Sequence, residues 1–343
     1  MARKKDTVTL KDVARLAGLS TGMASMALGD DPKVTQKTRE VVREAAQKLG
    51  YTPNNLGRAL RSKRIDAIAI VIPHSDQHVF SHPVLIEILG GITEVANTSK
   101  LTVILSTSQH EEDGDEAYLK ILKSRRADGI IVVAAAMNDP NVDRLISSEY
   151  PVVLLEARSS DPRVASVFAD SIGGAEQATA HLLEEHQLTR VAHITGPLNH
   201  RSAADKLEGY RAALGKHNVP FSQELVVEGD YSQESGRRAC IQLLEQGVEF
   251  QGIFAANDEM ALGALEALQE RGLEVPSDVA LIGFDDISVS KIVRPALTTV
   301  FQPAVDVGKL ATQLLIEIIE GKSIEEKQIQ LPTQLLIRNS CGC

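Results

Sequence analysis

Residues 9–20 read Thr9-Leu10-Lys11-Asp12-Val13-Ala14-Arg15-Leu16-Ala17-Gly18-Leu19-Ser20. Thr9, followed three residues later by Asp12, is a capping pattern that starts a helix, and Gly18 provides the left-handed residue that ends it. Ser20 is placed to cap a second helix across a tight turn. This spacing predicts a helix-turn-helix, an arrangement that carries its second helix into the major groove of DNA.

The residues after this motif predict one more helix and then a linker. Thr35 caps a third helix, in which apolar residues at i, i+3, i+4 and i+7 precede Gly50. From residue 51 to 65 the sequence can form only about two helical turns after Pro53, and isolated helices of that length are marginal in water. We therefore expect a head at 1–50 and a linker-like hinge at 51–65, which becomes ordered only when DNA is bound.

Charge divides the chain at the same place. The first 65 residues contain 14 Lys and Arg against 6 Asp and Glu, whereas the remainder contains 22 against 40. A cationic head on an anionic body predicts that the head binds a polyanion. The N-terminal residues are charged and no apolar run approaches the roughly 20 residues of a membrane span, so we expect a cytoplasmic protein without membrane contact.

The three cysteines provide no pairing framework, which fits a reducing compartment. Cys341-Gly342-Cys343 has the form of a metal or redox pair, but no other Cys or His stands near it at ligand spacing. We expect no metal, no cofactor and a frayed segment there. The histidines of the stretch His74, Asp76, His78 and His82 lie between Pro73 and Pro83 with nothing to fix them on one face, and we expect no metal at that stretch either.

The body alternates short β-branched apolar runs with amphipathic helices, which predicts parallel sheets covered by helices on both faces. Too many strands are present for one domain, so we expect two doubly wound α/β lobes at 66–343. We place lobe 1 at about 66–163 and 298–329, and lobe 2 at about 164–297 and 330–343. Ligands of such sheets bind at the carboxyl ends of the strands, here in a cleft between the lobes.

The ordered set of motifs resembles the lactose-repressor/galactose-repressor (LacI/GalR) family of transcription factors over nearly the whole chain. The resemblance rests on residues 9–20 and on four further stretches, namely Tyr51-Thr52-Pro53-Asn54, Phe254-Ala255-Ala256-Asn257-Asp258-Glu259-Met260-Ala261-Leu262-Gly263, Val275-Pro276-Ser277-Asp278-Val279-Ala280-Leu281-Ile282-Gly283-Phe284-Asp285-Asp286 and Leu297-Thr298-Thr299-Val300. It implies a homodimer on pseudo-palindromic operator DNA, and a core like that of periplasmic sugar-binding proteins.

The resemblance carries DNA contacts onto the head and hinge, at Thr9, Ser20, Thr21, Gly22, Met23, Ser25, Met26, Tyr51, Asn54, Asn55, Arg58 and Leu60. Leu60 stands where the family inserts a leucine wedge between base pairs of the minor groove. Met23 and Met26 occupy positions where Thr and often Arg are found. Methionine offers only apolar contact, for example to a thymine methyl, so Thr21 is the best candidate for a base-edge reader. The alternative for both methionines is packing within the head.

The effector site implied by the resemblance comprises His74, Lys206, Tyr231, Asn257, Asp285 and Gln302, with Phe168 and Asp170 as weaker candidates. Carboxylate and amide groups suit the hydroxyls of a polyol, and a flat ring suits the face of a pyranose. Lys206 replaces the usual arginine and loses its bidentate fork. Capping of a turn is the alternative role for Asn257 and Asp285.

These features predict a repressor whose operator affinity responds to a small molecule, most simply a sugar. A purine or nucleoside effector or corepressor is an alternative within the same class. A solute-binding protein is an alternative from another class, disfavoured by the basic head. An enzyme is disfavoured because Asp285-Asp286 has no Ser/His or Cys/His partner pattern.

Overall fold

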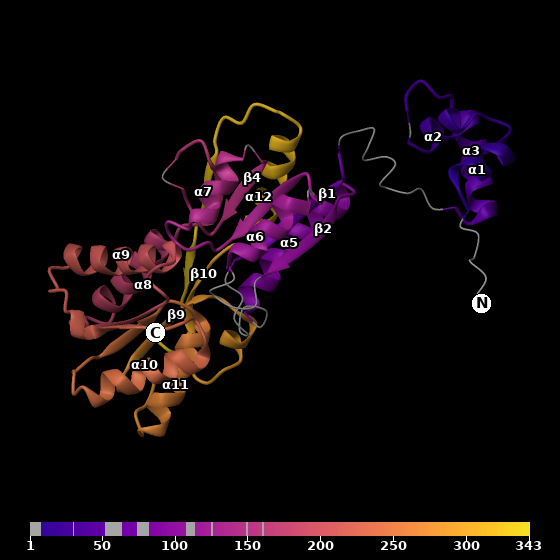
Figure 1. Cartoon of the computed structure of the whole chain (residues 1–343). Helices are drawn as coiled ribbons and strands as arrows, with labels where there is room; N and C mark the ends of the chain where they lie inside the picture. Colours follow the sequence, from indigo (N-terminus) through magenta and orange to yellow (C-terminus); the bar gives the residue numbers. More distant parts are fainter. Residues whose placement is uncertain are drawn as a thin grey trace, which may run out of the picture. The chain divides into compact units, whose positions relative to one another are not determined.

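A computed structural model describes residues 8–29, 31–51, 64–73, 82–107, 114–124, 126–148, 150–159 and 161–343. The chain separates into two compact units, Met1–Asp66 and Ala67–Cys343, and each is described by itself (Figure 1). No helix of the described residues is both long and apolar enough to cross a membrane.

The described part of the head contains the three helices expected from the sequence, α1 (Leu10–Ala17), α2 (Thr21–Leu28) and α3 (Gln36–Leu49). The Asp12 carboxylate accepts hydrogen bonds from Thr9 N (3.0 Å) and Thr9 Oγ1 (2.6 Å). Gly18 and Gly50 both adopt left-handed backbone at the helix ends. Small buried side chains form the common core of the head, with Val13 on α1, Ala24 and Ala27 on α2, and Val42 on α3.

The first sheet of the core has the strand order β11-β5-β4-β3-β1-β2 and is parallel throughout. Its strands are β1 (Ala67–Ile72), β2 (Thr102–Thr107), β3 (Gly129–Val133), β4 (Val152–Leu155), β5 (Ala165–Ala169) and β11 (Gln328–Leu331). Alternate strand residues face opposite sides. One side packs on α5 (Pro83–Thr98) and α12 (Ala304–Ile319), and the other on α6 (Gly114–Ser124) and α7 (Pro140–Ser147). The inner strands β1, β3, β4 and β5 are buried on both sides, which explains their continuous apolar runs.

The second sheet has the order β12-β10-β9-β8-β6-β7, and only β12 is antiparallel to its neighbour among the described strands. Its strands are β6 (Val191–Thr195), β7 (Val226–Glu228), β8 (Gly252–Ala255), β9 (Ala280–Asp285), β10 (Thr298–Phe301) and β12 (Gln334–Leu336). Helices α10 (Gln233–Glu245) and α11 (Asp258–Glu270) cover one side, and α8 (Ser171–Glu184) and α9 (Arg201–Lys216) the other. Short 3-10 turns, η3 (Gln223–Leu225) and η4 (Ser288–Lys291), connect these elements.

Two strands pair in a different lobe from the one expected. β5, expected to open lobe 2, pairs with β4 and β11 in the first sheet. β10, expected in lobe 1, pairs with β9 and β12 in the second sheet. The chain therefore crosses between the lobes after β5, after β10 and after β11. The expected lobe boundaries were wrong at these two strands. Long-range pairing determines which sheet a strand joins, and local composition does not encode it.

Helices α10 and α11 pack with their backbones in contact. A Cβ at Gly263 of α11 would collide with the backbone at Gln233 and Arg237 of α10, and a Cβ at Gly236 would collide with the backbone of Met260. Gly215 on α9 is exposed, and a Cβ there would meet nothing within 4 Å.

We expect Gly263→Ala to lower the free energy of unfolding by about 1–3 kcal/mol, because the helices must separate to admit the methyl group. Gly215→Ala is the matched control and should raise the same free energy by up to about 1 kcal/mol through helix propensity. Urea denaturation of both variants measures the difference. Equal effects of the two substitutions would contradict this description of the helix contact.

Candidate functional site

The N-terminal half of α2 presents a run of exposed residues. Thr21, Gly22 and Met23 are exposed, whereas Ala24 and Ala27 are fully buried in the head. Ser20 caps the helix by accepting a hydrogen bond from Met23 N at 3.2 Å. Its hydroxyl hydrogen stays available for a phosphate, so capping and DNA contact are compatible. Ser25 is half-buried, and Tyr51 packs partly against the head core.

The two methionines of α2 have different surroundings. Met23 is 39% exposed, whereas Met26 is half-buried and packs against the head core. The packing alternative therefore describes Met26, and Met23 is the methionine free to contact a base.

We expect Met23→Ala to weaken operator binding by about 3- to 10-fold, the loss of one apolar contact of about 1 kcal/mol, with the unfolding midpoint unchanged. Met26→Ala should instead destabilise the head by about 1–2 kcal/mol, because it removes partly buried packing. Fluorescence anisotropy with operator DNA and thermal unfolding distinguish the two. A Met23→Ala variant that unfolds earlier but binds DNA normally would reverse the assignment.

Several residues predicted to bind DNA or effector lie outside the described part of the chain. They are Asn54, Asn55, Arg58 and Leu60 of the hinge, and His74 after β1. Their roles stay predictions.

The remaining predicted effector residues, Phe168, Lys206, Tyr231, Asn257, Asp285 and Gln302, lie at strand ends, at crossings between the lobes or on α9. Tyr231 follows β7, Asn257 follows β8, and Asp285 ends β9. Because parallel strands end at one edge of a sheet, these three residues come together there. Lys206 reaches the same place from α9, with its Nζ 6.0 Å from the centre of the Tyr231 ring. Gln302 and Phe168 stand at crossings between the lobes.

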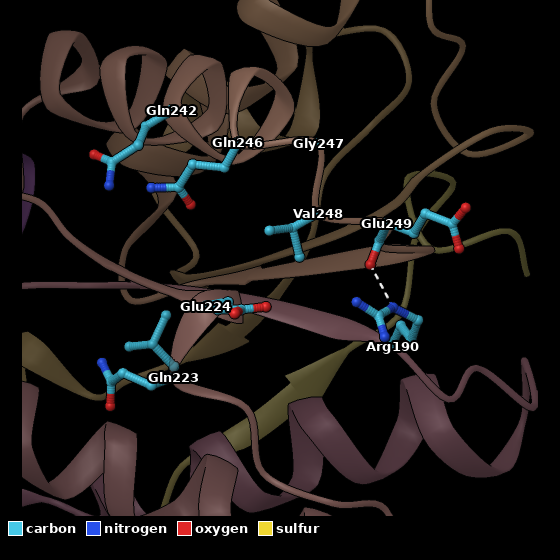
Figure 2. A pocket seen from close by; sticks show the side chains of 9 residues that line it. Arg190, Gln223, Glu224, Gln242, Gln246, Gly247, Val248 and Glu249 are labelled. Carbon is cyan, nitrogen blue, oxygen red and sulfur yellow. Dashed lines mark hydrogen bonds between the residues drawn. The ribbon is translucent and has the colours of Figure 1, made fainter.

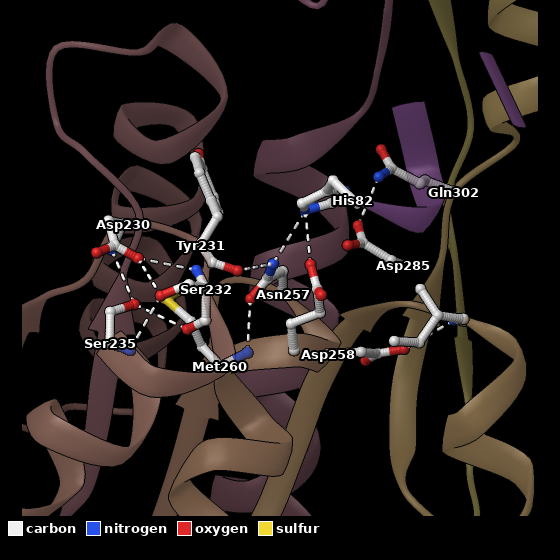
Figure 3. Close-up of polar contacts among 12 residues, drawn as sticks. His82, Asp230, Tyr231, Ser232, Ser235, Asn257, Asp258, Met260, Asp285 and Gln302 are labelled. Atoms are coloured by element: carbon white, nitrogen blue, oxygen red, sulfur yellow. Dashed lines mark hydrogen bonds and ion pairs between the residues drawn. The ribbon is translucent and has the colours of Figure 1, made fainter. Parts of the chain in front are cut away.

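Asn257 holds three elements of the cleft together (Figure 3). Its Oδ1 caps α11 by accepting from Met260 N at 2.9 Å. Its Nδ2 donates to the Tyr231 carbonyl at 2.9 Å and lies 3.1 Å from Nε2 of His82, which precedes α5 of the first lobe. Burial, followed by the charge of Lys206, lowers the pKa of His82 to about 4, so near neutral pH Nε2 can accept this hydrogen bond. The capping role is therefore present, and ligand contact stays a prediction.

The left-handed backbone of Tyr231 and the glycine beneath its ring together fix the position of this side chain. Its φ of 69° is left-handed, which is uncommon for a residue with a side chain. A Cβ at Gly196 would collide with the Tyr231 ring, so glycine is required beneath the ring. The hydroxyl of Tyr231 lies 3.2 Å from Ser202 Oγ on α9. The flat face of an aromatic ring is thus fixed at the edge of the second sheet.

Asp285 and Lys206 are residues of opposite charge type that are buried in the cleft. Both are buried, at 6% and 4% exposure. Burial raises the pKa of Asp285 and lowers the pKa of Lys206, because each charge is removed from water, and the attraction between the two groups opposes both shifts. Gln302 Nε2 donates to Asp285 Oδ1 at 2.5 Å. The Lys206 ammonium stands 4.2 Å from the centre of the Phe284 ring.

A second group of charges crosses the cleft beside Phe168. The Arg158 guanidinium lies 4.5 Å from the centre of the Phe168 ring and pairs with Asp205 of α9, which also pairs with Arg201 at 2.8 Å. Glu156 accepts from Ala169 N at 3.0 Å, and burial raises its pKa to about 7. These side chains leave a cavity of about 10 Å³ between the lobes, which is room for about one water molecule.

Another hollow lies on the second lobe, with a volume of about 760 Å³ (Figure 2). It is lined by Arg190, Gln223, Glu224, Val226, Gln242, Gln246, Gly247, Val248 and Glu249. Arg190 precedes β6 and Val226 begins β7, so the hollow lies at the amino ends of these strands. The polar residues of the cleft stand at the opposite, carboxyl ends, where α/β sheets bind ligands.

Sequence reasoning did not find Arg158, Glu156, Ser202 or Asp205 as members of the cleft. They lie on the segment between β4 and β5 and on α9, in stretches without a recognisable motif. Only the position of Asp205 next to Lys206 could have indicated that it belongs there.

Comparison with known proteins finds similar bacterial regulatory proteins over nearly the whole chain. Residues 9–54 match bacterial regulatory proteins of the lacI family, and residues 179–341 match a periplasmic binding protein-like domain. Catabolite control protein A of Priestia megaterium is 35% identical over 97% of this chain and 99% of that protein.

Two solved structures cover nearly the full length. The complex of the transcriptional regulator CelR with cellobiose has a TM-score of 0.76 and 32% identity, covering 97% of this chain and 99% of that one. The lac repressor dimer bound to operator and the anti-inducer ONPF has a TM-score of 0.86 and 27% identity, covering 98% and 99%.

Proposed function

This chain belongs to the lacI family of bacterial regulatory proteins, and from that premise we propose that it is a transcriptional repressor controlled by a small molecule. It binds a pseudo-palindromic operator as a homodimer, through α2 of each head. The molecule that controls it binds between the two lobes of the core. We place the protein in the cytoplasm, where its operator is.

The observation that carries this proposal is the convergence of polar side chains at the carboxyl ends of the second sheet, in a chain that also has a helix-turn-helix. Asp285, Asn257 and Lys206 meet at this edge beside the ring of Tyr231. The edge faces the first lobe, because Asn257 contacts His82. A ligand at this place touches both lobes and can change their arrangement.

The chemistry of the cleft favours a carbohydrate. Asp285 offers a buried acceptor for paired hydroxyls, and the Tyr231 ring offers an apolar face for a pyranose. CelR, solved with cellobiose, shows that a full-length relative accommodates a disaccharide. We assign ligand contact to Lys206, Tyr231, Asn257, Asp285 and Gln302, with Phe168 at the margin.

Binding of a sugar requires the cleft to change. The Arg158–Asp205 pair and the Asn257–His82 contact connect the lobes across the cleft, on either side of the place where the ligand is proposed to bind. The effector must therefore displace or replace these contacts, and differential contacts of this kind couple two sites by typically about 1–3 kcal/mol. Through the hinge, the new lobe arrangement changes how the two heads fit the operator.

Two other functions make different predictions. A purine or nucleoside corepressor would strengthen operator binding, and a nucleobase would stack on the Tyr231 ring. An enzyme would convert a candidate sugar into product. Members of this family are transcriptional regulators, and we propose that this chain has no catalytic activity.

The test is operator binding with and without candidate effectors. An operator is selected from random duplex DNA, and its affinity is measured by anisotropy at one fixed salt concentration, since affinities change steeply with salt. Monosaccharides, disaccharides, their phosphates and purines are then added in turn. A 5- to 150-fold shift with one saccharide, roughly the usual range of coupling, supports the proposal. If the selection yields no DNA duplex that the protein binds specifically, the repressor assignment is overturned. If no saccharide changes operator affinity, the sugar assignment is overturned.

A further inference from the structure

Four metal-ligating side chains lie together on the second lobe, away from the cleft. His181 is on α8, His186 follows that helix, and Cys341 and Cys343 come from the segment after β12. Their ligand atoms all lie within 4.8 Å of one another. Cys343 Sγ is 3.5 Å from Nε2 of His181 and 3.4 Å from Nε2 of His186.

We propose that His181, His186, Cys341 and Cys343 form a structural zinc site. Ligand atoms on tetrahedral zinc, with Zn–S of about 2.3 Å and Zn–N of about 2.0–2.1 Å, lie about 3.6 Å apart for a sulfur–nitrogen pair. The two distances from Cys343 Sγ are close to this value. Two thiolates with two imidazoles favour zinc over the hard cations, which prefer oxygen ligands.

The segment that carries the cysteines is held in place by hydrogen bonds rather than frayed, contrary to the sequence expectation. Ser340 Oγ accepts from Thr298 N at 2.8 Å and donates to the Leu281 carbonyl at 2.6 Å. Leu281 N donates to the Ser340 carbonyl at 2.8 Å. Cys341 is consequently only 2% exposed. A ligand anchored in this way is presented to a metal without further ordering cost.

Gly342 brings the second cysteine back toward the histidines. Its φ is +105°, a conformation that disfavours any side chain, and a Cβ there would lie 3.4 Å from Cε1 of His186. The rings of His181 and His186 are 5.1 Å apart at 76°, so they are not stacked and both Nε2 atoms can face one centre. Cys-Gly-Cys thus allows both sulfurs to approach the same pair of imidazoles.

The first sulfur also has an outer partner. Thr298 Oγ1 accepts from Arg338 N at 2.9 Å, and its own hydrogen is then directed to Cys341 Sγ at 3.2 Å. Such hydrogen bonds orient and stabilise a thiolate ligand. Four protein ligands leave no open coordination position, so the role of the zinc is to fix β10 and the Cys341–Cys343 segment against α8.

The test is the zinc content of the full-length chain purified under reducing conditions without a metal-affinity step. We expect about one zinc per chain in the wild type and in Cys240→Ala, whose cysteine is buried on α10 outside the cluster. Cys343→Ser, with an exposed side chain, and His186→Gln should retain less than about a tenth of this zinc. Cobalt should bind in its place, with the absorption of tetrahedral thiolate coordination.

Chelation provides a second measurement. A strong chelator should lower the unfolding temperature of the wild type and of Cys240→Ala by about 3 °C or more, and should not change that of Cys343→Ser. The proposal is overturned by a wild type that neither contains zinc nor binds added zinc. It is also overturned by a Cys341→Ser/Cys343→Ser variant that keeps wild-type zinc, or by a zinc-free chain with a Cys341–Cys343 disulfide under these conditions.

Discussion

The Asp285→Asn variant is expected to bind operator within about 3-fold of the wild type in the absence of effector, and to lose the response to effector. A hydrogen bond to a charged group contributes about 1.5–3 kcal/mol, so effector affinity should fall by about 10- to 150-fold. Asp285 is buried at the carboxyl end of β9 and far from the head in sequence, which is why operator affinity itself should persist.

The reason for the size of this effect is the isolation of Asp285 from water. Its Oδ1 already accepts from Gln302 Nε2, and the Lys206 ammonium balances its charge. An amide at position 285 keeps the shape but removes the negative charge that sugar hydroxyls would contact, and leaves Lys206 without this counter-charge.

Glu208→Gln is the matched control, because Glu208 is exposed on the same helix as Lys206. It removes one negative charge from the lobe without touching the cleft, and its effector response should equal that of the wild type. Anisotropy titrations of the three proteins against labelled operator give the comparison. An Asp285→Asn protein that still shifts by the full wild-type factor would remove Asp285 from the effector site.

Asp258→Ala is expected to lower the free energy of unfolding by at least about 3 kcal/mol, because three buried donors each lose an acceptor at a cost of about 1–3 kcal/mol. The Asp258 carboxylate accepts from Thr299 Oγ1 (2.5 Å), Ser290 Oγ (2.7 Å) and Ile287 N (3.0 Å). It is fully buried, and it joins the start of α11 to β10 and to the loop after β9. Its removal therefore loosens the floor of the cleft, next to Asn257 and Asp285.

Asp258→Asn keeps one acceptor oxygen and should lower the free energy of unfolding by about half as much as Asp258→Ala. Glu266→Gln, exposed on the same helix, should change the free energy of unfolding by less than about 0.5 kcal/mol. Urea denaturation followed by circular dichroism measures all three. If Asp258→Ala matched Glu266→Gln, the three hydrogen bonds would contribute nothing to stability.

Local chemistry explains why much of the fold could be predicted. The head helices begin and end at the residues expected from their caps, because caps act within a few residues. Strands β1, β3, β4, β6 and β8 coincide with the apolar runs, because burial on both faces leaves a continuous signal. The sheet to which β5 and β10 belong depends on distant partners, and local sequence contains no record of it.

The site was predictable to the extent that motifs carry it. Asn257 and Asp285 stand at the ends of strands that the sequence predicts, whereas the strand before Tyr231, β7, was not predicted. The cross-lobe pair of Arg158 and Asp205 was not predictable, because it depends on how the two lobes face each other. The same holds for His181 and His186, which stand more than 150 positions before Cys341 and reach it only through the packing of α8.

If the cleft and the operator site are coupled, the coupling must be reciprocal, and this reciprocity can be measured. The affinity of the effector is measured by calorimetry with the free protein and with the protein saturated by operator DNA. We expect operator to change effector affinity by the same factor, between about 5 and 150, by which effector changes operator affinity. An effector affinity that is identical with and without operator would contradict it.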